Sequence, residues 1–123
     1  MRKILLVEDE DILRDTFVLI MASQPYIVDT AEDGQAALSL CRKNTYDLIL
    51  LDLMMPVLDG VGFLKLFMPE KSVRTKVVIL SNLSAGEDIE TAMELGADRT
   101  ILKSSYSPKQ LLSMVRYELG ATI

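Results

Sequence analysis

The chain has 123 residues, of which 50% are hydrophobic and 25% charged, and its 18 acidic and 13 basic residues give a net charge of -5. This length fits one domain with a hydrophobic core of its own. The chain has no histidine and a single cysteine, Cys41. These counts exclude an internal disulfide, histidine general-base catalysis and an ordinary zinc site. The acidic balance argues against nucleic-acid binding, which needs clustered lysine and arginine.

The apolar run that follows the first three residues is too short for a signal peptide. No stretch approaches the roughly 18 consecutive apolar residues of a membrane-spanning helix. We therefore expect a cytoplasmic protein that has no membrane partner. We also expect residues 1–123 to form one domain without an effector domain, because the last helical segment ends near the C-terminus and no linker is visible.

Short apolar runs alternate with segments of helical spacing along the chain. In chain order, the runs predict strands over 4–7, 26–28, 48–51, 77–80 and 100–102. Three of these runs are continuously apolar, which is typical of central strands in a parallel sheet covered on both faces, whereas the more polar second run indicates an edge strand. The intervening segments predict helices over 11–23, 34–43, 60–67, 86–95 and 107–119. This alternation predicts an α/β fold with a doubly wound, five-stranded parallel sheet.

Helix signals fall between the predicted strands. Asp59 is a candidate N-cap, and Ser107 is another with a proline after it at the first helical position. Pro69 should end the third helix at Met68, because the residue before a proline disfavours the helical conformation. Gly96 is a candidate C-terminal cap for the fourth helix.

Polar side chains follow the strands at their carboxyl ends, where open α/β sheets bind ligands. The first strand leads into Glu8 and Asp9, the third into Asp52, the fourth into Ser81 and the fifth into Lys103. Like charges about 4 Å apart repel by about 4 kcal/mol at an effective dielectric near 20. A hard divalent cation relieves this repulsion, and oxygen ligands without His or Cys indicate Mg2+ or Mn2+. Such a site can also hold a phosphoryl group, which makes Asp52 a candidate nucleophile.

The same residues carry a family resemblance over essentially the whole chain. Glu8-Asp9 after the first run, the segment Leu51-Asp-Leu-Met-Met-Pro-Val-Leu-Asp-Gly60, Ser81, and Gly96-Ala-Asp98 leading to Lys103 occur in this order. Together they resemble the receiver domain of two-component response regulators. The resemblance implies a flavodoxin-like (βα)5 fold and a single-domain response regulator that switches by phosphorylation rather than acting as an enzyme on other molecules.

The resemblance also implies a role for each matching position. Asp52 would accept a phosphoryl group from the phosphohistidine of a histidine kinase or phosphotransfer protein. Glu8 and Asp9 would hold Mg2+ together with Asp52, and the backbone carbonyl of Met54 would complete the metal shell. The absence of histidine from this chain fits a donor histidine on a separate protein.

Two further positions match the switching apparatus, and three depart from it. The resemblance assigns Ser81 as the hydroxyl that moves toward the phosphoryl group, and it assigns Lys103 as the phosphate-contacting lysine. Thr100 stands where the family commonly has a switching Tyr or Phe, and Asn82 replaces a small residue. Ser104 replaces the usual proline, so we expect the Lys103–Ser104 bond to be trans.

Three alternative functions compete with this interpretation. Thr100 and Asn82 are also consistent with a docking module whose binding does not depend on phosphorylation. A haloacid-dehalogenase-like phosphatase would need an acid two residues after the nucleophile, where this chain has Met54. A flavin or dinucleotide binder would need a glycine-rich first loop, and Gly60-Val-Gly62 lacks the third glycine.

Partner surfaces follow only from the resemblance. The first helix near Leu13 and the loop at Ser105 and Tyr106 should meet the kinase or phosphotransfer protein. The face built from the fourth helix, fifth strand and fifth helix should serve an unknown output protein or a homodimer.

Overall fold

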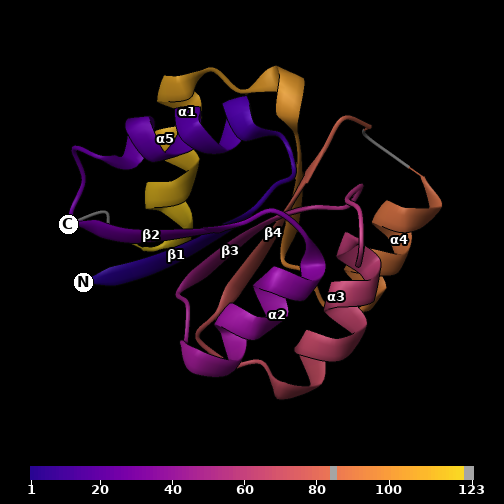
Figure 1. The fold of residues 1–123 in the computed structure, drawn as a ribbon. Helices are drawn as coiled ribbons and strands as arrows, with labels where there is room; N and C mark the ends of the chain where they lie inside the picture. Colours follow the sequence, from indigo (N-terminus) through magenta and orange to yellow (C-terminus); the bar gives the residue numbers. More distant parts are fainter. Residues whose placement is uncertain (84–85, 121–123) are drawn as a thin grey trace.

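The computed structural model describes residues 1–83 and 86–120, and these residues form one parallel sheet with helices on both faces (Figure 1). The strands are β1 (Arg2–Val7), β2 (Tyr26–Ala31), β3 (Leu48–Asp52), β4 (Lys76–Ser81) and β5 (Arg99–Leu102). The helices are α1 (Asp11–Met21), α2 (Gly34–Lys43), α3 (Gly60–Phe67), α4 (Glu87–Glu94) and α5 (Pro108–Glu118), and two 3-10 turns are η1 (Met68–Glu70) and η2 (Lys103–Ser105). The sheet order is β2-β1-β3-β4-β5, which confirms the predicted doubly wound α/β fold and the edge position of β2.

The two faces of the sheet support separate hydrophobic clusters. Helices α1 and α5 cover one face, and α2, α3 and α4 cover the other (Figure 1). Along β1, Ile4 and Leu6 belong to the α1/α5 cluster, whereas Leu5 and Val7 belong to the opposite cluster. Because successive side chains of a strand point to opposite faces, a strand covered on both sides must be apolar at every position. Coverage of the sheet on both faces therefore explains why the central strands are continuous apolar runs in the sequence.

Helix ends agree with the sequence signals, with shifts of one or two residues. Asp59 Oδ1 accepts a hydrogen bond from Gly62 N at 2.8 Å. Ser107 and Gln110 form a reciprocal capping box. Helix α1 ends at Met21 rather than at residue 23, since the following residues form turns that lead into a proline. Gly96 has φ +110° after α4, the left-handed conformation that glycine adopts at no steric cost.

The connection between β3 and α3 is folded tightly back onto its own strand. Gly60 N donates to Leu53 O at 3.0 Å, and Gly34 N at the start of α2 donates to Leu58 O at 2.8 Å. A Cβ atom at Gly34 would lie 2.4 Å from Leu58 O, so only glycine allows this approach. Between these contacts, Leu58 N donates to Pro56 O at 2.7 Å in a turn whose central residue, Val57, has φ +67°. A β-branched residue is strained in this conformation.

Candidate functional site

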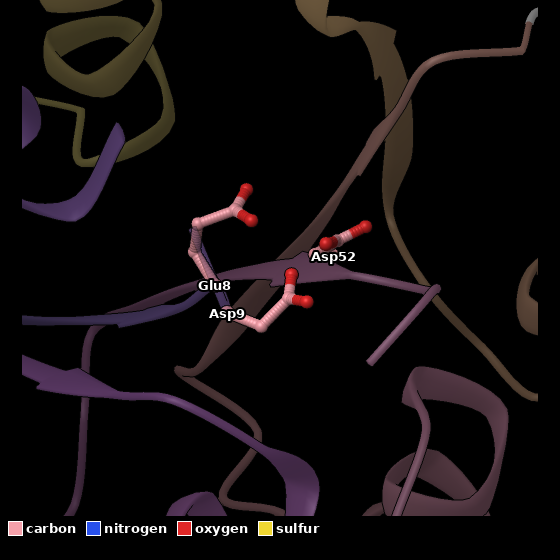
Figure 2. A group of neighbouring side chains, drawn as sticks. All are labelled: Glu8, Asp9 and Asp52. Atoms are coloured by element: carbon pink, nitrogen blue, oxygen red, sulfur yellow. The ribbon is translucent and has the colours of Figure 1, made fainter. Parts of the chain in front are cut away.

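Three carboxylates meet at the carboxyl edge of the sheet, as the sequence predicts. The strand register pairs Val7 with Leu51, so the chain positions that follow, Glu8 and Asp52, lie side by side at the ends of β1 and β3. One carboxylate oxygen from each of Glu8, Asp9 and Asp52 lies within 4.8 Å of the others (Figure 2). Glu8 and Asp52 are buried, with exposed fractions of 1% and 5%, whereas Asp9 is exposed.

Lys103 joins two of these carboxylates from the far side of β4. Its Nζ lies 2.6 Å from Glu8 Oε1 and 3.3 Å from Asp52 Oδ2. The side chain of Lys103 is only 12% exposed. The long lysine stem therefore carries one positive charge into a group of three carboxylates, and the site keeps an excess of negative charge.

Burial governs the ionisation of this group. It raises the pKa of Glu8 from 4.5 to about 7, against the opposing hydrogen bond from Lys103. Burial also raises the pKa of Asp52, and the charge of Lys103 opposes that change. For Lys103 burial acts to lower the pKa, but the hydrogen bond to Glu8 and the charge of Asp52 outweigh it and raise the pKa overall. The two buried carboxylates are therefore costly to ionise together with no second cation beside them.

Backbone amides and one arginine orient the buried acids. Met54 N donates to Asp52 Oδ1 at 3.2 Å, and Glu10 N donates to Glu8 Oε2 at 3.2 Å. Arg14 reaches back from α1, where its Nη1 donates to the backbone oxygen of Glu8 at 2.8 Å. Arg14 is not among the site residues predicted above, because nothing in the sequence shows that an arginine on a helix will meet a carbonyl at a strand end.

Ser81 lies at the same edge of the sheet, one residue beyond the Asp52–Leu80 pair of the strand register. It is 8% exposed, and its Oγ accepts a hydrogen bond from Leu83 N at 3.0 Å. Of the residues that depart from the family pattern, Asn82 is exposed and Thr100 is half-buried in β5. The Lys103–Ser104 bond is trans, as expected from the absence of proline.

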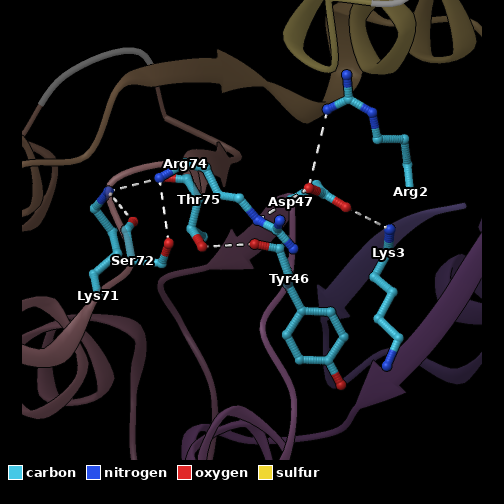
Figure 3. A network of polar contacts seen from close by, with 8 residues as sticks. All are labelled: Arg2, Lys3, Tyr46, Asp47, Lys71, Ser72, Arg74 and Thr75. Atoms are coloured by element: carbon cyan, nitrogen blue, oxygen red, sulfur yellow. Dashed lines mark hydrogen bonds and ion pairs between the residues drawn. The ribbon is translucent and has the colours of Figure 1, made fainter.

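A second polar network, which no sequence motif predicts, fixes the strand register at the opposite edge of the sheet (Figure 3). Asp47, just before β3, accepts from Lys3 N through Oδ2 at 2.8 Å, and its own N–H donates to Lys3 O at 2.8 Å. Lys76 N donates to Asp47 O at 3.0 Å. Two arginines form ion pairs with Asp47 Oδ1. Arg2 Nη1 lies 4.0 Å from this oxygen, and Arg74 Nε lies 3.6 Å from it. Because this network ties β1, β3 and β4 together at their starts, it helps to align the acids at their ends.

The donor set fits a hard divalent cation. Glu8, Asp9 and Asp52 offer only carboxylate oxygens, which Mg2+ and Mn2+ prefer, and the sequence has no histidine. The exposed Asp9 leaves one side of the cluster open to solvent, where a metal ion that keeps several waters can be accommodated. The expected acid cluster is thus present with the chemistry that a magnesium site requires.

The fold is that of a doubly wound α/β protein, a class that binds ligands at the carboxyl ends of its strands, where this chain has the acid cluster and Lys103. The chain matches the family model of the response regulator receiver domain over residues 4–116. It belongs to this family. Receiver domains are phosphoacceptor switches of two-component signalling and are not generally classed as enzymes, and they bind Mg2+ at an acidic pocket.

Individual relatives agree with this assignment. The chain is 36% identical over 120 residues to the probable transcriptional regulator ycf27 of Guillardia theta, covering 98% of this chain and 46% of the relative. It is 35% identical over 116 residues to the response regulator ArlR of Staphylococcus haemolyticus, covering 94% of this chain and 52% of the relative. The chain thus spans about half the length of these curated relatives.

Solved structures show the same architecture. The receiver domain of the Francisella response regulator 1452 superposes with a TM-score of 0.83 at 29% identity, covering 100% of both chains. The chemotaxis response regulator CheY4 of Vibrio cholerae superposes with a TM-score of 0.86 at 28% identity, covering 96% of this chain and 98% of that one. In residues 1–83 and 86–120, each helix is too short or too polar to span a lipid bilayer.

Proposed function

We propose that Asp52 accepts a phosphoryl group from the phosphohistidine of a histidine kinase or phosphotransfer protein, and that the phosphorylated chain signals through a conformational change and protein contact. The observation that carries this proposal is the position of Asp52, buried between the acid pair that follows β1 and the ammonium group of Lys103. We further propose that this reaction takes place in the cytoplasm, and that the chain functions as a single-domain response regulator.

The residues divide the work of phosphoryl transfer between them. A carboxylate oxygen of Asp52 attacks phosphorus, an oxygen–phosphorus bond forms, the phosphorus–nitrogen bond of the donor breaks, and its electron pair returns to the imidazole. Lys103 Nζ lies 3.3 Å from Asp52 Oδ2, and we infer from this short distance that its charge offsets negative charge on the transferred group. Water then hydrolyses the aspartyl phosphate at the same site, which returns the carboxylate and releases phosphate.

The metal ligands in this proposal are Glu8, Asp9, Asp52 and the backbone carbonyl of Met54. Bound Mg2+, for which Mn2+ could substitute, would supply positive charge against the phosphoryl oxygens. Asp9 is exposed, whereas the Glu8 carboxylate accepts a hydrogen bond from Glu10 N, so Glu8 would be the more constrained of the two ligands. Met54 N already donates to Asp52, which keeps its backbone beside the acceptor while its side chain is 73% exposed.

Ser81 links the acceptor site to the loop before α4. In this proposal the Ser81 hydroxyl, which now accepts a hydrogen bond from Leu83 N, donates to a phosphoryl oxygen. A movement of Ser81 toward Asp52 would pull on this hydrogen bond and displace Leu83. In the proposal, this is how phosphorylation reaches the output face without a switching aromatic residue at Thr100.

A groove beside the site supports docking of the donor protein. It has a volume of about 140 Å³ and is lined by Leu13 and Phe17 of α1 together with Tyr106 before α5, while Glu8 and Lys103 border it toward the acids. Leu13 is 39% exposed. We expect L13A and Y106A to slow phosphotransfer from a histidine kinase or phosphotransfer protein while leaving phosphorylation by a small-molecule donor intact. Unchanged protein-to-protein transfer in both variants would remove this surface from the proposal.

The output surface in this proposal is the face of α4, β5 and α5. Arg99 on β5 forms an ion pair with Glu118 of α5, with 3.0 Å between Nε and Oε1. Its guanidinium group also lies over the ring of Tyr117, which is 65% exposed. Helix α4 carries several acidic residues, whereas α5 carries Lys109 and Arg116. The opposite charges of α4 and α5, which flank the edge strand β5, suit either a homodimer or an output protein of complementary charge, and sedimentation before and after phosphorylation distinguishes the two.

The second candidate function is docking that does not depend on phosphorylation, favoured by Thr100 in place of the switching aromatic residue. The variant D52N separates the two functions. The switch requires partner binding under phosphorylating conditions to differ between wild type and D52N, whereas phosphate-independent docking leaves them equal.

The acceptor itself is tested by trapping. Borohydride reduces an acyl phosphate to an alcohol, so a phosphorylated Asp52 becomes homoserine and is identified by peptide mass. The proposal requires homoserine at position 52 after treatment with acetyl phosphate and Mg2+. Reduction at Glu8 or Asp9 instead would show that Asp52 is the wrong carboxylate.

A further inference from the structure

Arg14 makes a contact that the phosphoacceptor chemistry does not itself require. It is the fourth residue of α1, and its side chain is only 16% exposed although it is an arginine near the protein surface. Its Nη1 donates to the backbone oxygen of Glu8 at 2.8 Å, and its Nη2 pairs with the exposed carboxylate of Asp11. The guanidinium group therefore connects the start of α1 to the end of β1.

The carbonyl that Arg14 binds belongs to the peptide group between Glu8 and Asp9. Glu8 lies one residue past the end of β1, and its N–H donates to Ala31 O of β2 at 3.0 Å. Arg14 supplies a hydrogen bond to the carbonyl of the same residue, so both backbone polar groups of Glu8 are held. A hydrogen bond from a charged donor is about twice as strong as one between neutral groups. These two backbone hydrogen bonds constrain the direction in which the chain leaves Glu8 toward Asp9.

We propose that Arg14 is a positioning residue for the magnesium site, which it serves by holding the Glu8–Asp9 peptide so that both carboxylates face Asp52. This inference rests on the proposed metal-dependent function. Arg14 contacts none of the candidate metal-binding oxygens directly, since its bonds run to the backbone of Glu8 and to Asp11. It acts on the metal only through the acids that it orients.

Charge and positioning predict opposite effects of removing Arg14, and this makes the proposal testable. A guanidinium group near a cation site repels the cation, so its removal should strengthen Mg2+ binding if charge were its only contribution. Loss of the hydrogen bond to Glu8 frees the acid pair and should weaken binding. Partners that orient metal ligands typically contribute about 10- to 100-fold in affinity.

The experiment is a calorimetric titration of the full chain with MgCl2, without any phosphoryl donor. We expect R14M to bind Mg2+ about 10-fold more weakly than wild type. R14K retains a charged donor on a long stem and should recover most of this loss. R42A removes the same charge from the exposed end of α2 and should leave the affinity unchanged.

The outcomes separate this inference from the function on which it rests. Wild-type binding together with unchanged or tighter binding in R14M overturns the role of Arg14 and leaves the magnesium site intact. Absence of Mg2+ binding by the wild type overturns both. If R14M fails to fold, R14Q takes its place in the comparison with R14K, and thermal melting of each variant checks that an affinity change is not a loss of folded protein.

Discussion

Replacing Glu8 by glutamine should stabilise the metal-free protein, and the gain should grow with pH. Glu8 is 1% exposed and shares Lys103 with Asp52. Burial raises the pKa of Glu8 to about 7 in the folded chain, against an ordinary value of 4.5. The folded state therefore holds this proton more tightly than the unfolded state. The contribution of Glu8 to stability is most favourable below pH 4.5 and is lost as the pH rises to about 7.

The two pKa values determine the size of the effect. The difference between 4.5 and about 7 corresponds to about 3 kcal/mol in the free energy of unfolding once Glu8 is fully ionised. Glutamine keeps the shape of the side chain and carries no charge to bury. We therefore expect the free energy of unfolding of E8Q to exceed that of wild type by about 3 kcal/mol at pH 8 and by less than about 1 kcal/mol at pH 5.

Urea denaturation in EDTA at several pH values measures this difference. E10Q, which removes the neighbouring exposed carboxylate, is the control for a change in net charge. Added Mg2+ should reverse the order at pH 8, because wild type gains binding energy from a complete ligand set and E8Q has lost one ligand. A difference between E8Q and wild type that stays constant from pH 5 to pH 8 would refute the reasoning about burial.

Two further predictions concern the loop that carries the site from β3 to α3. V57G should raise the free energy of unfolding, measured by urea denaturation, by about 1 kcal/mol. Val57 has φ +67° and is 82% exposed, so glycine relieves backbone strain with little loss of packing. A loss of stability would show that the turn is not strained. G60A should lower the free energy of unfolding by about 3 kcal/mol in the same assay, because the new Cβ would lie 2.7 Å from the backbone of both Asp52 and Leu53. Wild-type stability in G60A would contradict this steric argument.

Much of the fold could be predicted from the sequence because each strand is covered on both faces. Val77, Val78 and Ile79 are all buried, so their run has no polar interruption and stands out. The caps at Asp59 and Ser107 could also be predicted, since they depend on a few consecutive residues. The end of α1 is less predictable, because the turns that follow Met21 are specified only weakly by the local sequence.

The candidate site could be predicted in its members but only partly in its contacts. The carboxyl ends of neighbouring parallel strands must meet, so the positions of Glu8 and Asp52 in the sequence are enough to bring them together. That Lys103 bonds Glu8 more closely than Asp52 depends on side-chain conformation and on the span across β4, which no local pattern encodes. The contacts of Arg14 and Asp47 likewise join residues through the tertiary fold.

Intact-mass measurement after incubation with acetyl phosphate tests whether Asp52 is the phosphoacceptor. Wild type in Mg2+, wild type in EDTA, and D52N in Mg2+ are compared under the same conditions. We expect a single phosphoryl adduct on wild type that requires the metal and is absent from D52N. An adduct of equal yield on D52N, or the absence of any adduct on a wild-type chain that binds Mg2+, would contradict the assignment of Asp52 as phosphoacceptor.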